Sequence, residues 1–141
     1  MKRVLDSSVA FKWVVPELHS DKALLLRDDY RNGTVQLIAP DIFLGEVAHA
    51  LTRAERQKRI TPTQGAQALA DILNTPPLLV GYIALLPRAY EISSHHHVGV
   101  FDCLYVALAE REGCDLVTAD DRMVKNLQPH FPFLVALASL P

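Results

Sequence analysis

The sequence predicts an α/β fold with a mostly parallel central sheet flanked by helices on both faces. Short apolar runs of strand length alternate along the 141 residues with longer segments whose apolar residues recur at helical spacing. This alternation is typical of strands joined by crossover helices, which align the strands in parallel. No repeat, low-complexity tract or linker interrupts the pattern, so we expect residues 1–141 to form a single domain.

Composition and charge limit the class of protein. Half of the residues are hydrophobic and 21% are charged, which is enough apolar area for a packed core. Fourteen Lys and Arg against 16 Asp and Glu give a net charge of -2, so a nucleic-acid partner would need a local patch, a metal or a second subunit. We expect a cytoplasmic protein without signal peptide or membrane span, whose Cys103 and Cys114 are reduced core thiols.

The first 60 residues alternate between the two patterns. Ser7 or Ser8 can cap the first helix, which Pro16 ends. Gly33 ends the second helix, and Asp41 can cap the third. In order, this part of the chain predicts strand Lys2–Leu5, a helix from Ser7, a helix over Ser20–Tyr30, strand Val35–Ala39 and a helix from Asp41 to about Lys58.

The next helix begins with a clear signal. Thr61, followed by proline at the first helical position, predicts a capped helix over Thr63–Leu73. We expect the buried face of this helix to carry Ala66, Ala70 and Leu73.

The rest of the chain returns to the alternation. The run Leu78–Leu86 is apolar, short and bounded by prolines, so we expect part of it to form a strand. The remaining predicted elements are a helix over Arg88–Ser93, a helix over Phe101–Glu112, strand Asp115–Thr118, a helix from Asp120 or Asp121 through Leu127, and strand Phe133–Ala136.

Four acidic residues stand out by their position. Asp6 follows the first predicted strand, and Asp120 follows a later one. Asp102 opens an otherwise apolar helix, and Glu46 interrupts an apolar helical stripe. Ligands of parallel sheets bind beyond the carboxyl ends of the strands, so these four side chains can converge there.

Converging carboxylates need a compensating charge or a proton. Two unit charges about 4 Å apart repel by roughly 4 kcal/mol at an effective dielectric near 20. Protons, the nearby cations Lys12 and Arg122, or a divalent cation would relieve this repulsion. An oxygen-only donor set suits Mg²⁺ or Mn²⁺ rather than zinc. Taken singly, however, the same acids are also typical helix caps, first-turn acids or exposed side chains, and spacing alone leaves both interpretations open.

Four segments carry a more specific pattern. They are Val4-Leu5-Asp6-Ser7-Ser8, Glu46-Val47 followed by Ala50-Leu51, Phe101 to Glu110, and Leu116-Val117-Thr118-Ala119-Asp120. In order and spacing these segments resemble PIN-domain ribonucleases of the VapC toxin type, over essentially the whole chain. The resemblance implies the three-layer α/β/α fold of that family, with a mostly parallel central sheet.

The resemblance also implies a set of site residues. It matches Asp6, Glu46, Asp102 and Asp120 to the acidic quartet that binds Mg²⁺ or Mn²⁺ and performs catalysis. Supporting positions are Ser8, which matches the polar residue beside the first Asp, together with Thr118 and Asp121. The residue before Asp102 is usually Tyr in such toxins and is Phe101 here, which removes a hydroxyl but leaves the quartet intact.

On this basis we expect an endoribonuclease that hydrolyses RNA phosphodiester bonds, leaves a 5′-phosphate, and acts as the toxin of a toxin–antitoxin pair. Asp6, Asp102 and Asp120 are the expected metal ligands, while Glu46 positions the attacking water or a second ion. The candidate RNA contacts are Lys12, Arg53 and Arg122. The implied partners are a VapB-like antitoxin, which would insert an Arg or a peptide segment near the acids, and a second copy of the chain in a homodimer.

Other functions compete with this interpretation. A catalytically silent, partner-binding module could share the fold. A receiver-like phospho-acceptor domain would need an acidic pair after the first strand, where Ser7 follows Asp6, and an Asp-nucleophile phosphatase would need a second Asp at Ser8. The triplet His95-His96-His97 places its side chains on different sides of a helix or strand, so we expect exposed structural histidines rather than a zinc site.

Overall fold

The computed structural model describes all 141 residues and contains one five-stranded sheet in which every strand runs parallel to its neighbours. The strands are β1 (Lys2–Leu5), β2 (Gln36–Pro40), β3 (Leu78–Val80), β4 (Asp115–Thr118) and β5 (Leu134–Ala136). Their spatial order is β3-β2-β1-β4-β5. Strands β2 and β3 are therefore added on one side of β1, and β4 and β5 on the other. The predicted fold class is confirmed.

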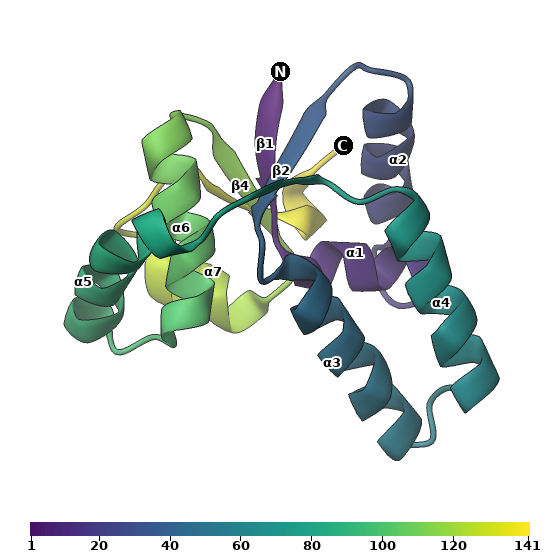
Figure 1. Cartoon of the computed structure of the whole chain (residues 1–141). Coiled ribbons are helices and arrows are strands. Elements are labelled where there is room, and N and C mark those ends of the chain that lie inside the picture. The colour runs from purple at the N-terminus through teal and green to yellow at the C-terminus, as the bar shows by residue number, and fades with distance from the viewer.

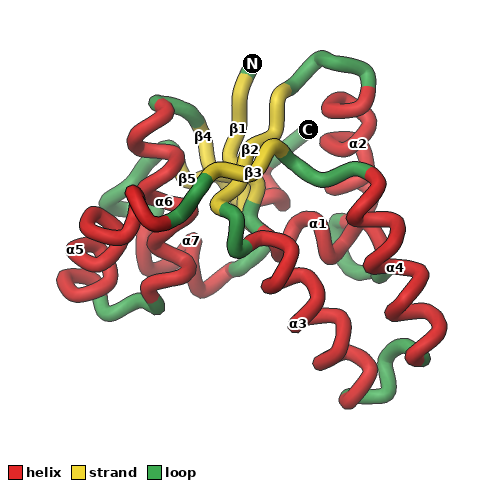
Figure 2. The backbone as a smooth tube through the Cα atoms, in the orientation of Figure 1, coloured by secondary structure: helices red, strands yellow, loops and turns green.

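Helices cover both faces of this sheet. Figure 1 shows α1 to α4 on one side and α5 to α7 on the other, with α3 and α4 extending together away from the sheet. Figure 2 shows the five strands gathered between these two helical layers. The helices are α1 (Ser7–Val14), α2 (Ser20–Arg31), α3 (Phe43–Arg56), α4 (Pro62–Asn74), α5 (Leu86–His96), α6 (Val100–Glu112) and α7 (Asp121–Leu127), with short 3₁₀ turns at Ile83–Leu85 and Leu137–Ser139.

One core of 36 buried hydrophobic residues joins the sheet to both helical layers. Helix α6 lies deepest, because it contacts β1, β2 and β4 on one side and α5 on the other. Seven consecutive α6 residues, Cys103–Ala109, are therefore buried, which explains why this helix is apolar around its whole circumference. Its first turn, with Asp102, is fixed in place by that packing.

Two expected helix caps are absent. Helix α1 starts after Asp6 as its N-cap residue, and neither Ser7 nor Ser8 caps it, because both are already inside the helix. Helix α3 begins at Phe43 instead of after Asp41. The Asp41 N–H donates to the Val80 carbonyl at 2.8 Å and its Oδ1 accepts from the Tyr82 N–H at 3.1 Å, which ties the chain after β2 to the edge strand β3.

Helix α4 is capped as predicted, since Thr61 and Gln64 form a reciprocal capping box. Its predicted buried face is wrong. Ala66, Ala70 and Leu73 are exposed, and the helix instead buries Gly65, Ala68 and Ile72. Gly65, at the start of this buried face, lies against the Glu55 side chain of α3.

The apolar run Leu78–Leu86 forms a strand only over Leu78–Val80. Its remainder turns through the 3₁₀ segment into α5, which begins at Leu86 and accepts Pro87 in its first turn. Helix α5 also continues past Ser93 to His96 and ends where His97 adopts a left-handed backbone with φ of 56°. No helix of the structure is both long and apolar enough to cross a membrane.

Candidate active site

Two of the four predicted acids lie at the carboxyl ends of adjacent inner strands, at the same edge of the sheet. Strands β1 and β4 are neighbours, and Asp6 and Asp120 follow them directly. Because the strand order changes direction between β1 and β4, this edge is the topological switch point at which parallel sheets bind ligands. Asp102 joins from the first turn of α6, and Glu46 from the first turn of α3.

A hollow of about 390 Å³ opens at this edge. Asp6, Asp102 and Asp120 line it, and so do the predicted cations Lys12 and Arg53. We call this the acidic hollow. Ser8, a predicted supporting residue, lines it too, so the structure brings six of the sequence-predicted site residues around one space.

Two further predicted residues lie next to the acidic hollow. Arg122 lines a smaller hollow of about 250 Å³ that shares Asp102 and Asp120 with the acidic one. Glu46 does not line the acidic hollow, but it is close enough to the acids that its charge raises the pKa of both Asp6 and Asp102. Asp121, in contrast, is exposed on the first turn of α7 and lines neither hollow.

Two hydroxyl groups hold the carboxylate of Asp6. Ser8 Oγ and Thr118 Oγ1 both donate to its Oδ2, the second at 2.9 Å. The backbone N–H groups of Ala119 and Asp120 donate in turn to Ser8 Oγ at 3.0 Å and to Thr118 Oγ1 at 3.1 Å, which orients both hydroxyls. Burial raises the pKa of Asp6 to about 6, although the two hydroxyl hydrogen bonds oppose this shift.

Asp102 lies beside this network without joining it. Its carboxylate is partly buried and accepts no hydrogen bond that would offset its charge. Burial first, and then the charges of Asp6, Asp120 and Glu46, raise the pKa of Asp102 to about 7. At neutral pH this side chain is therefore balanced between its protonated and charged forms.

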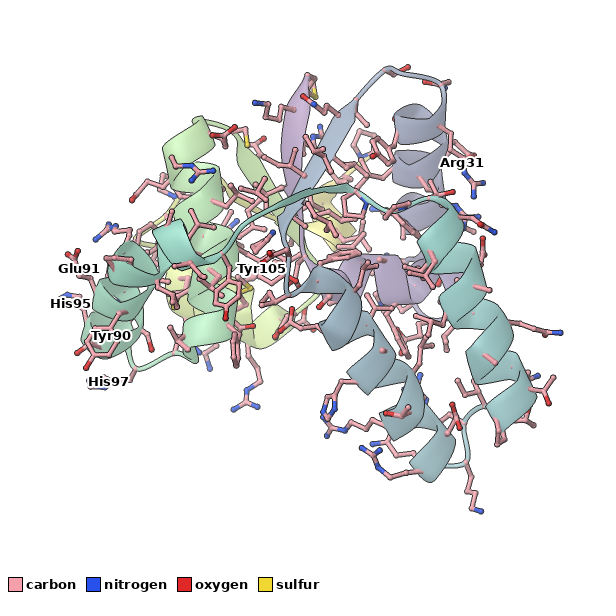
Figure 3. The ribbon with its side chains drawn as sticks, in the orientation of Figure 1. Arg31, Tyr90, Glu91, His95, His97 and Tyr105 are labelled. Carbon is pink, nitrogen blue, oxygen red and sulfur yellow. The ribbon has the colours of Figure 1, made fainter.

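Glu46 is held by side chains that the sequence analysis did not single out. Tyr105 Oη donates to Glu46 Oε1 at 2.6 Å, and Ser7 Oγ donates to the same oxygen at 3.3 Å. Burial raises the pKa of the Tyr105 hydroxyl, so it remains a donor throughout the physiological range. Figure 3 shows Tyr105 in the interior of the molecule. The available signal was its position three residues after Asp102, on the same face of an otherwise apolar helix.

Asp120 has two roles. Its Oδ1 accepts the N–H groups of Arg122 at 3.0 Å and Met123 at 3.3 Å, and so caps α7. Its side chain also lines the acidic hollow. The cap interpretation and the site interpretation are therefore compatible for this residue.

The cations around the acidic hollow differ in how they are engaged. Lys12 Nζ lies 3.3 Å from Glu17 Oε1, and Arg59 Nη2 lies 2.6 Å from Glu17 Oε2. Glu17 itself lines the acidic hollow, and no sequence signal pointed to it. Arg53 takes part in none of the ion pairs of the protein.

Comparison with known proteins gives the family. The sequence model of the PIN domain matches residues 3–126. The chain belongs to the PIN domain family. Ribonuclease VapC3 from Pyrobaculum aerophilum is 30% identical to it over 137 residues, which cover 96% of this chain and 98% of the relative.

Two solved structures share the fold of this PIN domain. The crystal structure of PAE2754 from Pyrobaculum aerophilum has a TM-score of 0.70 at 18% identity and covers 99% of this chain and 94% of its own. The structure of VapBC2 from Rickettsia felis, bound to a DNA fragment from their promoter, has a TM-score of 0.63 at 17% identity and covers 96% and 97%.

The donor atoms of the PIN domain's acidic hollow fit a hydrated hard cation. All candidate ligands are carboxylate oxygens, and the Asp102 carboxylate has no protein donor to offset its charge. No three His, Cys, Asp or Glu side chains lie close enough together to hold a metal on their own. Mg²⁺ accepts such an open arrangement, because it usually keeps several waters and uses only one or two carboxylates.

Of the histidine triplet, only His97 reaches the site, because it lines the smaller hollow together with Asp102, Asp120 and Arg122. His95 and His97 are exposed at the end of α5, where Figure 3 shows them at the edge of the molecule near Tyr90 and Glu91. His96 is half-buried, and its ring lies 4.6 Å from that of His130 and 5.5 Å from that of Phe131, centre to centre.

Proposed function

We propose that this PIN domain is an endoribonuclease that depends on Mg²⁺ or Mn²⁺ and hydrolyses RNA phosphodiester bonds. The observation that carries the proposal is the acidic hollow, in which Asp6, Asp102 and Asp120 face one space at the switch point of the sheet, with Glu46 beside them. The relative named ribonuclease VapC3, matched over almost its full length, supports the same activity.

Asp6, Asp102 and Asp120 are the residues that would hold the ion, one or two of them directly and the rest through its bound waters. When bound, the ion would supply charge neutralisation, orientation of the scissile phosphate and a water of lowered pKa. Ser8 and Thr118 keep Asp6 in its orientation, so that its charge need not reorganise during the reaction.

The other polar residues have separate tasks. Glu46 uses Oε1 for Tyr105 and Ser7, which leaves its second oxygen to accept a proton from the attacking water. Lys12 and Arg53 on one side of the acids and Arg122 on the other would bind RNA phosphates.

This proposal includes a cellular role as the cytoplasmic toxin of a toxin–antitoxin pair, assembled as a homodimer and inhibited by a VapB-like protein. The VapBC2 structure from Rickettsia felis, similar over 96% of this chain, supports such a partner. An Arg side chain from the antitoxin would be stabilised in the acidic hollow, because Asp102 has no counter-charge of its own there.

Cleavage of a defined RNA panel tests the activity. The wild type should cut with Mn²⁺, leave 5′-phosphate ends, and stop when EDTA is added. Asp6→Asn and Asp102→Asn should abolish cutting while circular dichroism stays unchanged, whereas Asp28→Asn, on an exposed face of α2, should cut normally.

Three results would contradict the proposal. Unchanged cleavage in both site variants would remove the assigned residues. A wild type that folds and never cuts would favour the catalytically silent module. Phosphorylation by acetyl phosphate that is sensitive to hydroxylamine would favour a receiver-like domain.

A further inference from the structure

The acidic hollow continues into a second hollow along α3. The two share Phe11, Ala50 and Arg53. The second has a volume of about 350 Å³. Its full lining is Phe11, His49, Ala50, Arg53, Gln57 and Arg59. We call this second hollow the α3 trough.

One face of α3 forms the floor of the trough. His49, Arg53 and Gln57 follow one another at intervals of four residues, so they lie in a row on the helix surface, and all three are exposed. Glu46 precedes His49 by three residues on the same face. At 1.5 Å per residue, the row leads from the acids to the far end of α3 over about 16 Å.

The charge of the trough contrasts with that of the acidic hollow. No carboxylate lines the trough, whereas Asp6, Asp102, Asp120 and Glu17 line the acidic hollow. Arg53 lies where the two meet and has no ion-pair partner, so its guanidinium is free for an anion. A phosphate chain that reaches the acids from this side would therefore pass a free cation first.

The side chains beyond Arg53 suit a nucleic acid with unpaired bases. His49 and Gln57 offer polar side-chain atoms that can contact base edges or ribose hydroxyls. The Arg59 guanidinium lies 5.8 Å from the centre of the Phe11 ring and is paired with Glu17 of the acidic hollow, so Arg53 is the unpaired cation of the trough. The neighbouring cations Arg56 and Lys58 do not line the trough, although they belong to the same basic run of the sequence.

We infer that the single-stranded RNA next to the cleaved bond binds in the α3 trough, with a phosphate on Arg53 and with His49 and Gln57 on its bases or sugars. This inference rests on the proposed ribonuclease activity and adds the direction in which the substrate leaves the acidic hollow. It assigns substrate binding to Gln57 and His49, and it assigns phosphate binding to Arg53 but not to the neighbouring Arg56 and Lys58.

A matched pair of arginines on one helix provides the test. Arg53→Gln and Arg56→Gln each remove one charge from an exposed position of α3, and only Arg53 lines the trough. Binding of a labelled single-stranded RNA is measured by fluorescence anisotropy in the non-cleaving Asp102→Asn background. Arg53→Gln should weaken binding about tenfold and reduce the slope of log K against log salt by about 0.7, while Arg56→Gln changes neither.

A second pair adds charge instead of removing it. Gln57→Glu places a carboxylate in the trough, and Thr52→Glu places one on α3 outside it. In the cleaving protein, Gln57→Glu should raise KM several-fold with little change in kcat, whereas Thr52→Glu leaves both constants unchanged. This split indicates a binding role, because a damaged fold or active centre would lower kcat as well.

The outcomes separate this inference from the proposed function. If the wild type cuts RNA but the two members of each pair behave alike, the trough assignment is overturned and the ribonuclease stands. If the trough variants weaken binding of an antitoxin peptide and leave RNA binding unchanged, the trough is a protein-binding site and the inference is again overturned. A wild type that cuts no RNA overturns both.

Discussion

Asp6 and Asp102 face the same hollow, yet their surroundings differ. Asp6 is buried at 5% exposure and receives two hydroxyl hydrogen bonds, each backed by a backbone N–H group. Asp102 is held only by the packing of its helix, and its carboxylate receives no hydrogen bond. Burial raises the pKa of both, to about 6 and about 7, but only Asp6 has neighbours that oppose the shift.

This difference separates two ways of placing a charge in a protein. The Asp6 side chain is oriented in advance by its two hydroxyl partners. Asp102 supplies charge that only an external partner can compensate, so it makes the hollow responsive to cations. Substitutions that remove the donors of Asp6 or the charge of Asp102 should abolish the difference between the two residues, and substitutions elsewhere should have smaller effects.

Removing the Ser8 and Thr118 hydroxyls should leave the Asp6 carboxylate without hydrogen-bond donors, as the Asp102 carboxylate is. In the double variant Ser8→Ala/Thr118→Val, Asp6 keeps its burial and loses the bonds that favour its charged form, so its pKa rises further. Cleavage at pH 7 should fall about 10²-fold or more, since each outer partner of a metal ligand typically contributes 10- to 100-fold. The pH–rate profile should show its acidic limb moved to higher pH, and an unmoved limb would contradict this account of the hydroxyls.

Neutralising Asp102 should stabilise the metal-free protein. Its pKa of about 7 in the folded state exceeds the ordinary value of 3.8, so the folded state keeps a proton that the unfolded chain releases as pH rises. The wild type therefore loses stability between about pH 4 and pH 7, and Asp102→Asn avoids this loss. After a discount for the solvent-exposed part of the side chain, we expect a gain of about 2 kcal/mol at pH 8.

Thermal unfolding in EDTA measures this gain. The difference in Tm between Asp102→Asn and the wild type should be near zero at pH 4 and several degrees at pH 8. Adding Mn²⁺ at pH 8 should raise the Tm of the wild type and shrink the difference. A difference that is independent of pH would show that the cost of a buried Asp102 charge, with repulsion from the other acids, is not its origin. Asp28→Asn serves as the control for an exposed carboxylate.

Tyr105→Phe tests whether Glu46, like Asp6, depends on a hydroxyl donor to hold its carboxylate in place. The variant deletes the 2.6 Å hydrogen bond to Glu46 Oε1 and keeps the buried ring. We expect a loss of about 1 kcal/mol in the free energy of unfolding and about tenfold in cleavage rate. Urea unfolding and steady-state kinetics check the two effects. Unchanged values in both would mean that Ser7 alone is sufficient to hold Glu46.

An exposed ion pair provides the smallest effect. Arg88 forms two hydrogen bonds with Glu110, at 2.8 and 3.0 Å, but both side chains are largely in water. Arg88→Gln should therefore change the free energy of unfolding by less than about 0.5 kcal/mol, as measured by urea unfolding. If Arg88→Gln lowered the free energy of unfolding as much as Tyr105→Phe does, exposed ion pairs would matter as much as the buried hydrogen bond to Glu46, which would contradict this account.

The residues that could be predicted from sequence are those defined by local patterns. Asp6 and Asp120 follow short apolar strands, and the capping signals at Thr61 and Asp120 act within three residues. Such signals depend only on neighbouring residues, so a single sequence contains them. The same holds for the order of strands and helices, which predicts the fold class.

The features that could not be predicted depend on contacts between distant segments. Glu17 enters the acidic hollow because two cations from different elements hold it there. The buried face of α4 was misassigned because Ala residues occur on several of its sides, and which side is buried depends on the packing of α4 against α3 and α1. Asp41 left its expected cap position for bonds to Val80 and Tyr82, about 40 residues away.

The separation in sequence between the two halves of the Asp6 network has a consequence for protein synthesis. Asp6 lies at the start of the chain, and Thr118, which donates to it, follows 112 residues later on a strand that pairs with β1. Translation proceeds from the N-terminus, so a nascent polypeptide has no complete Asp6 network until β4 has left the ribosome. A polypeptide that ends before β4 lacks both Thr118 and Asp120, so the acidic hollow that we propose as the cleaving centre cannot form in it.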